Sequence, residues 1–286
     1  MVSEATVRTR IWPETEKLIT ATLAEDDDAL RDLLVPRSEA ALLHHLFGFP
    51  VFDLLLKTVL GREQLALTRA IETDKGKYVH IEFVWPDPGA SDASYTAADI
   101  VSVQLRRYKG AWRVVAVNPA ATDFPLTEPR AQGILVSAER AAGGKLPQEP
   151  WILPVALFAG SLQLPLRDRA TAEPVLALLL PGMQQRSYGA LSLVGAFRLW
   201  HDFTRKASPD PGDPAAWAGA VEFIMSEQNL RELTQAAVGK YYGVSLTAML
   251  PRIRQIKEIL NLHDLDARYS ALGGTQVVLR DKSNGA

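Results

Sequence analysis

The sequence predicts an α+β fold for the N-terminal part of the chain and an all-α bundle of five helices for the C-terminal part. Apolar residues recur at helical spacing up to residue 60, and from residue 65 to residue 117 they alternate with polar residues as in strands. A segment rich in proline, alanine and glycine comes next, and helical spacing returns between residues 169 and 262. The predicted divisions are therefore residues 1–120, a connecting segment 121–168, a helical domain 169–262 and a tail 263–286.

Four helices are expected before the strands. Pro13 suits the first turn of a helix, and three apolar residues give that helix one buried side. The run Asp26-Asp27-Asp28 can cap a second helix, and Ser38 a third one that reaches Phe47. A fourth helix is expected at residues 51–60, where Gly61 ends it.

Metal or cofactor binding is not expected. The three consecutive aspartates could suggest a metal, but no ligand partners recur at metal spacing, so a helix cap is the preferred interpretation. His44 and His45 are adjacent on a helix and cannot both face one metal ion. The chain contains no cysteine, which excludes disulfides, thiolate metal sites and cysteine nucleophiles.

Four strands are expected to form an antiparallel meander. They cover residues 65–73, 78–85, 95–108 and 111–117, and turn residues separate them at 74–76 and 109–110. A further strand is expected at residues 155–164, within the connecting segment.

The order of these elements resembles the nuclear transport factor two-like (SnoaL-like) superfamily. The matching pieces are residues 24–34 in the helices and the closing hairpin, residues 101–115. The resemblance implies a curved sheet wrapped around helices as a cone. Members of the superfamily include isomerases, dehydratases, ligand carriers and dimerisation modules, so the fold does not choose a function.

Enzymes of that superfamily place acidic, histidine or tyrosine side chains inside the cone. The corresponding catalytic candidates here are His80, Glu82 and Asp99, with Tyr95 as a helper. His80 and Glu82 are two residues apart and so share one side of the sheet. A solvated pair of charges explains them as well as a general base does.

The C-terminal helices begin at residues 171, 188 and 213, and a helix-turn-helix pair comes after them. Asp213 caps the third helix, and Pro214 occupies its first position. Gln235-x-x-Val-Gly-x-x-x-Gly-Val-Ser245 resembles the helix-turn-helix pattern. In this pattern Gly239 allows close helix crossing, Gly243 takes the left-handed turn and Ser245 caps the second helix. The apolar face of that helix is formed by Met249, Ile253, Ile256 and Leu260.

The helical domain also resembles the cyclin-like repeat of the archaeal and eukaryotic transcription factor B family. The resemblance lies in residues 217–224, 233–235 and 242–245. It implies that the last two helices contact DNA. The residues expected to bind nucleic acid are Thr234, Gln235, Ser245, Thr247, Arg252, Arg254 and Lys257.

The expected groove-facing helix departs from that family's pattern. Leu246, Ala248 and Leu250 cannot pair with base edges. Pro251 lacks a backbone donor, so either the helix is kinked there or it begins at Pro251. Arg252, Arg254 and Lys257 could instead form a solvated helix face.

The overall charge limits the classes of function that the chain can have. The formal net charge is −2, which excludes a generally basic protein, although residues 229–262 hold five basic and two acidic residues. No apolar run reaches the length of a membrane span and no signal peptide is recognised, so a cytoplasmic protein without a membrane partner is expected.

Three functions remain open. The first is a non-catalytic regulatory or adaptor protein, in which the helical domain binds nucleic acid or protein and the cone serves homodimerisation or a small apolar ligand. The second is an isomerase or dehydratase that uses the cone. The third is an assembly scaffold.

Overall fold

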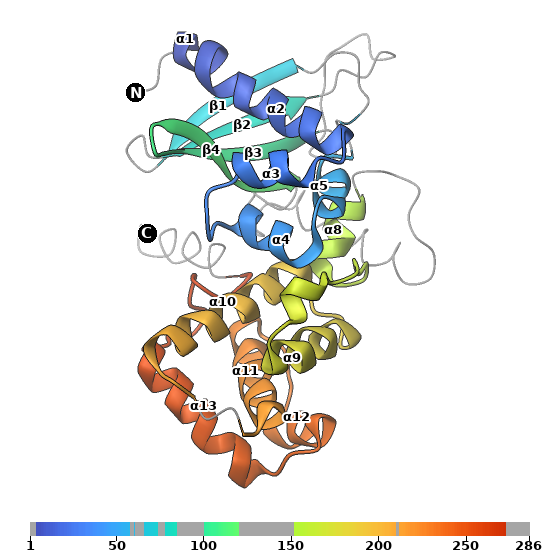
Figure 1. Cartoon of the computed structure of the whole chain (residues 1–286), viewed down its shortest axis with the longest axis vertical. Helices are drawn as coiled ribbons and strands as arrows, with labels where there is room; N and C mark the ends of the chain where they lie inside the picture. Colours follow the sequence, from blue (N-terminus) through green and yellow to red (C-terminus); the bar gives the residue numbers. More distant parts are fainter. Residues whose placement is uncertain are drawn as a thin grey trace, which may run out of the picture. The chain divides into compact units, whose positions relative to one another are not determined.

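The computed structural model describes residues 4–57, 60, 66–73, 78–84, 100–119, 152–209 and 212–272. Within these ranges helices accompany an antiparallel sheet in the first part of the chain, and helices alone are found from residue 165 onwards (Figure 1). The α+β class is therefore confirmed. Backbone contacts divide the chain into two compact units, Met1–Leu164 and Pro165–Ala286.

The first unit opens with six helical segments in the described range 4–57. They are α1 (Glu4–Thr6), the π-helical turn η1 (Val7–Ile11), α2 (Trp12–Leu23), α3 (Asp27–Leu33), α4 (Glu39–Phe47) and α5 (Pro50–Leu55). The Asp26 carboxylate accepts a hydrogen bond from the Ala29 amide at 2.9 Å, and the Ser38 hydroxyl one from the Ala41 amide at 3.2 Å. Both predicted caps are confirmed. The helix expected to reach residue 60 ends at Leu55, because the backbone leaves the helical region at Leu56.

The sheet of the first unit is a meander. Strands β1 (Ala66–Thr73), β2 (Tyr78–Val84), β3 (Ile100–Tyr108) and β4 (Ala111–Pro119) pair in chain order, each antiparallel to the next. Lys109 and Gly110 join β3 to β4 with positive φ angles of 49° and 84°. Two successive residues of this kind match the twist of a tight hairpin, as the sequence predicts.

The core of the first unit lies against the last strand. Helices α2, α4, α5 and α8 all contact β4, and Val103, Leu105, Val114 and Val117 are completely buried. A polar link joins the helices. His44 is buried and lies 2.9 Å from an Asp27 carboxylate oxygen, which also accepts the Phe49 amide at 3.1 Å.

The strand predicted at residues 155–164 is wrong. Helix α8 (Ile152–Ala159) occupies the first half of this stretch and packs on α5 and β4. A short, wholly apolar run has no period that separates a buried strand from a buried helix. Gly160 ends the helix with φ 86°. The predicted connecting segment 121–168 therefore contains part of the first unit, while residues 121–151 lie outside the described ranges.

The second unit is built around one central helix. After the 3-10 turn η4 (Asp168–Thr171) come α9 (Pro174–Gln185), α10 (Ala190–Lys206), α11 (Pro214–Gln228), α12 (Gln235–Tyr242) and α13 (Leu246–Leu260). Helix α11 lies among the other four α-helices of the unit and contacts each of them (Figure 1). It is buried from Ala216 to Ser226. The helix expected to begin at Thr171 is α9, which begins at Pro174. Thr171 is instead the last residue of the 3-10 turn η4.

Four helices of this unit end in the same hydrogen-bonded turn, in which a residue with left-handed backbone comes after the helix. These residues are Ser187, Leu230, Gly243 and Asn261. In each turn the next amide bonds back to the carbonyl five residues earlier, as Arg231 does to Ser226 at 2.8 Å. Glycine is the residue that adopts this conformation most easily, so the other three carry a conformational cost.

Candidate functional site

The α12–α13 pair has the local geometry that the sequence predicts. The Thr234 hydroxyl accepts the Ala237 amide at 3.1 Å and so caps α12. Gly243 adopts φ 66° and ψ 29°, and the Ser245 hydroxyl accepts the Ala248 amide at 3.2 Å to cap α13. Three residues thus separate the two helices, and both begin at a hydroxyl cap.

Glycines allow the helices of this pair to approach one another and α11. A Cβ added to Gly239 would lie 3.0 Å from the Val244 carbonyl oxygen. A Cβ added to Gly219 of α11 would lie 3.1 Å from the Met249 sulfur and 3.3 Å from Tyr242. A side chain at Gly239 would press on backbone at the turn, and one at Gly219 would require Met249 and Tyr242 to shift by a few tenths of an ångström.

The inner face of α13 is apolar and buried. It consists of Met249, Ile253, Ile256 and Leu260, as the sequence predicts. Burial of each such side chain stabilises the fold by about 1.5–3 kcal/mol. This face fixes the rotation of α13, so its opposite face is directed to solvent.

Helix α13 begins at Leu246 and continues through Pro251, which resolves the two alternatives for its start. Pro251 is exposed on the outer side. It deprives the Thr247 carbonyl of a helical donor. Thr247 is itself exposed, so water can bind that carbonyl.

Most of the residues expected to bind nucleic acid have roles inside the protein. Thr234 and Ser245 are the helix caps. Arg252 donates to the Ala248 carbonyl at 2.6 Å and lies 5.1 Å from the centre of the Trp217 ring. Lys257 pairs with Glu227 at 2.7 Å. These contacts direct two of the three cations of α13 towards α11.

The remaining candidates lie on the outer side. Thr247 and Arg254 are exposed, and Gln235 is half-buried. Lys240 of α12 is exposed as well. Neither Arg254 nor Lys240 forms an ion pair with another residue that the structure describes. Leu246 is also exposed, at 40%, so the exposed side chains of the pair include two cations and an apolar residue.

A buried ionic cluster holds α12 against the rest of the unit. Glu222 of α11 is fully buried, and its carboxylate oxygens accept from Arg186 Nε at 2.5 Å and Nη2 at 2.7 Å. Tyr242 Oη donates to the same carboxylate at 2.5 Å. Burial and the neighbouring Glu222 charge raise the pKa of the Tyr242 hydroxyl far above its ordinary value. The Arg186 guanidinium also lies 3.5 Å from the centre of the Tyr241 ring.

A pocket of about 310 Å³ lies beside this cluster. Its walls come from α9, the start of α11 and the end of α12, and they include Leu178, Gly182, Gln185 and Tyr241. Leu178 and Tyr241 are each 42% exposed. The Tyr241 hydroxyl donates to the Gln185 side chain. This pocket adds a second exposed apolar surface close to α12.

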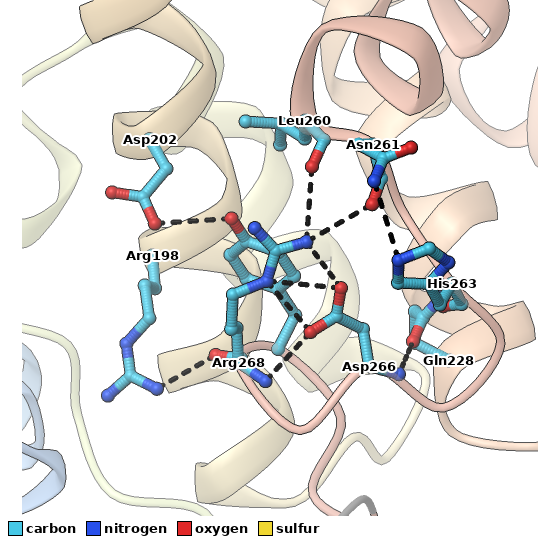
Figure 2. Close-up of polar contacts among 9 residues, drawn as sticks. Arg198, Asp202, Gln228, Leu260, Asn261, His263, Asp266 and Arg268 are labelled. Atoms are coloured by element: carbon cyan, nitrogen blue, oxygen red, sulfur yellow. Dashed lines mark hydrogen bonds and ion pairs between the residues drawn. The ribbon is translucent and has the colours of Figure 1, made fainter.

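A second polar cluster holds the segment after α13 (Figure 2). Arg268 donates to both carboxylate oxygens of Asp266 and, at 3.1 Å, to the Leu260 carbonyl at the end of α13. Tyr269 is buried, and its hydroxyl donates to Asp202 of α10 at 3.2 Å. A Cβ on Gly195 would lie 2.0 Å from the Tyr269 carbonyl oxygen. Residues 263–272 contain neither helix nor strand, as expected, and they form turns anchored by the buried Asp266 and Tyr269.

Neither cluster is predicted from the sequence. One signal was present for Glu222, which is the single charge within the apolar stretch Trp217–Met225. Asp266 and Arg268 gave no signal, because their role depends on a turn that no local pattern defines.

The catalytic candidates of the first unit are only partly placed. His80 and Glu82 lie on β2, opposite Gln104 and Ser102 of β3. Asp99 and Tyr95 lie outside the described residues.

Within the described ranges, no three His, Asp or Glu side chains gather as a metal site would require. The same ranges contain no helix of the length and apolar character needed to cross a bilayer. Comparisons with protein-family models, with curated proteins and with solved structures found no match to this chain.

Proposed function

We propose that the chain is a non-catalytic regulatory or adaptor protein, in which α12 and α13 form a helix-turn-helix that binds a protein partner. The observation that carries this proposal is the outer face of the pair. The Gly243 turn and the Ser245 cap support the motif, while the side chains on the outer face include Leu246, Thr247, Pro251 and a single α13 cation, Arg254. Such a face suits an apolar protein surface better than base edges.

The distribution of exposed apolar side chains supports a protein partner. Among the described residues, the large apolar side chains that are most exposed are Leu23, Leu178, Leu230, Tyr241 and Leu246. All but Leu23 belong to the second unit. Leu178 and Tyr241 line one pocket, and exposed apolar side chains that gather in this way are typical of a protein-binding surface.

The first unit supplies a second function in this proposal. Its helices and meander fit the cone of the nuclear transport factor two-like superfamily, which serves homodimerisation or holds a small apolar ligand. The four-stranded order and the helices that pack on β4 support this interpretation.

Site-specific photo-crosslinking of the full chain in its source cells tests the protein-binding proposal. A photoreactive phenylalanine at Leu246 should capture one defined protein, while the same residue at Leu23 should not. Leu23 is the matched control because it is an exposed leucine of the first unit, 58% exposed. Introducing Pro251→Glu should abolish capture from Leu246. Equal capture at both leucines would show that exposure alone explains the products.

DNA binding is the second candidate, and the hydroxyl of Thr247 with the exposed Lys240 and Arg254 favours it. Two phosphate contacts would give a slope of about −2 for the logarithm of affinity against that of salt concentration. Fluorescence anisotropy with a labelled duplex of random sequence measures this slope. The candidate requires saturable binding that the double variant Lys240→Gln/Arg254→Gln weakens, and salt-independent or absent binding excludes it.

A further inference from the structure

A pocket of about 300 Å³ lies between the end of α10 and the segment after α13. Its walls are formed by Asp202, Arg205, Lys206, Arg268 and Tyr269. Three cations and one carboxylate therefore line the pocket, and the charge of Arg268 is paired with Asp266. Asp202 already accepts a hydrogen bond from the Tyr269 hydroxyl at 3.2 Å, so part of its acceptor capacity is used. The pocket has an excess of positive charge although the whole chain has a formal charge of −2.

One wall of the pocket is held rigidly. The Arg268 guanidinium is fixed by Asp266 and by the carbonyls of Leu260 and Asn261 (Figure 2). Arg198 donates to the Arg268 carbonyl at 2.8 Å, and Tyr269 is only 2% exposed. A side chain fixed in this way loses little conformational entropy when a ligand binds to it.

The other wall offers donors that the fold does not use. Arg205 and Lys206 are exposed, and within the described ranges no hydrogen bond or ion pair involves either side chain. They occupy the last turn of α10, where positive charge is favourable to the helix dipole. The helix dipole accounts for their charge, but it does not account for their position around a concave pocket that also contains Arg268.

We propose that this pocket binds the phosphate group of a small phosphorylated molecule. A phosphate monoester carries close to two negative charges near neutral pH and three acceptor oxygens. Arg205 can bind two of these oxygens with its planar donors, and Lys206 supplies a further charge. A single carboxylate has only one charge and two oxygens, and it would leave part of this donor set unused. The volume of the pocket exceeds that of a phosphate group, so it has room for the group to which the phosphate is attached.

Isothermal titration calorimetry of the full chain with inorganic phosphate and with pyrophosphate tests this site, against sodium chloride at matched ionic strength. We expect saturable binding of one or both anions, at a ratio of one per chain. The variant Arg205→Gln/Lys206→Gln should weaken binding at least about tenfold, the effect of losing roughly 1.4 kcal/mol. The matched control is Arg107→Gln/Lys109→Gln, which removes two exposed cations of the first unit and should change affinity less than about twofold.

Each outcome decides the proposal. Loss of binding in the pocket variant alone supports it. Equal weakening in both double variants, or no saturable binding of either anion, overturns it. A titration with a DNA duplex distinguishes the source of the phosphate. If neither free anion binds but the pocket variant has a lower affinity for the duplex, the pocket binds phosphates of a nucleic-acid backbone. The small-ligand proposal then fails. The site does not depend on the helix-turn-helix function, so the two proposals fail independently.

Discussion

Replacing Glu222 with glutamine should destabilise the second unit strongly. Glutamine keeps the volume of the side chain but removes its charge and replaces one acceptor oxygen with an amide donor. Arg186 would then have an NH₂ group where it now has a carboxylate oxygen at 2.5 or 2.7 Å. Removing one partner of a buried ion pair leaves the other charge without compensation, at a cost of about 3–5 kcal/mol.

The geometry places the expected value near the lower end of this range. Glu222 is fully buried, but the Arg186 side chain is 19% exposed and retains some contact with water. We therefore expect the variant to lower the free energy of unfolding by about 3 kcal/mol. Glu227 provides a matched control on the same helix. It pairs with Lys257 at 2.7 Å with both side chains 42% exposed, so Glu227→Gln should lower the free energy of unfolding by less than about 1 kcal/mol.

Hydrogen exchange of the full chain, measured by mass spectrometry, shows which helices are destabilised. Peptides from α11 and α12 should exchange faster in Glu222→Gln and nearly unchanged in Glu227→Gln. The double variant Arg186→Met/Glu222→Gln should recover part of the loss, because it removes the uncompensated cation. The reasoning is refuted if the two single variants behave alike, or if the double variant loses the full sum of the single effects.

Two further predictions concern the turns of the second unit. Leu230→Gly should raise the free energy of unfolding by about 0.5–1 kcal/mol, since Leu230 has φ 53° and is 63% exposed; a lower urea midpoint would contradict this. The hydrogen bond from Arg268 holds the pKa of Asp266 below its ordinary value, against the opposing effect of burial. A depressed folded pKa means that this stabilisation is present above about pH 4 and is lost as pH falls through the folded pKa. The urea midpoint, measured between about pH 2 and pH 7, should therefore fall less on acidification in Asp266→Asn than in the wild type. An equal fall in both proteins would exclude this contribution of Asp266 to stability.

The parts of the fold that could be predicted are those that local chemistry determines. Asp26, Ser38 and Ser245 each precede a helix, and their side chains accept the amide that a helix start leaves without a partner. Lys109 and Gly110 likewise determine a hairpin locally, because both adopt positive φ angles. Such features need only a few neighbouring residues, so a single sequence contains them.

Other parts depend on distant contacts. Helix α8 has no polar side chain to show its periodicity, and it is a helix in a setting made by α5 and β4. Leu230 takes the left-handed position after α11 where glycine would be expected, and the neighbouring Arg231 anchors this turn by donating to the Arg186 and Ser187 carbonyls. Glu222 lies within an apolar helix, and its role requires an arginine 36 residues earlier and a tyrosine 20 residues later.

The candidate site shows why a motif that predicts backbone geometry need not predict what it binds. Thr234 and Ser245 are hydroxyl residues, as DNA contact would favour, but their oxygens accept amides at the starts of α12 and α13. Arg252 and Lys257 are cations on the second helix, but α11 supplies the Trp217 ring and the Glu227 carboxylate that they contact. The polar groups that suggested DNA binding are largely those that build the pair. The outward surface of the pair is set by the residues that remain, and Leu246 and Pro251 among them give that face its apolar character.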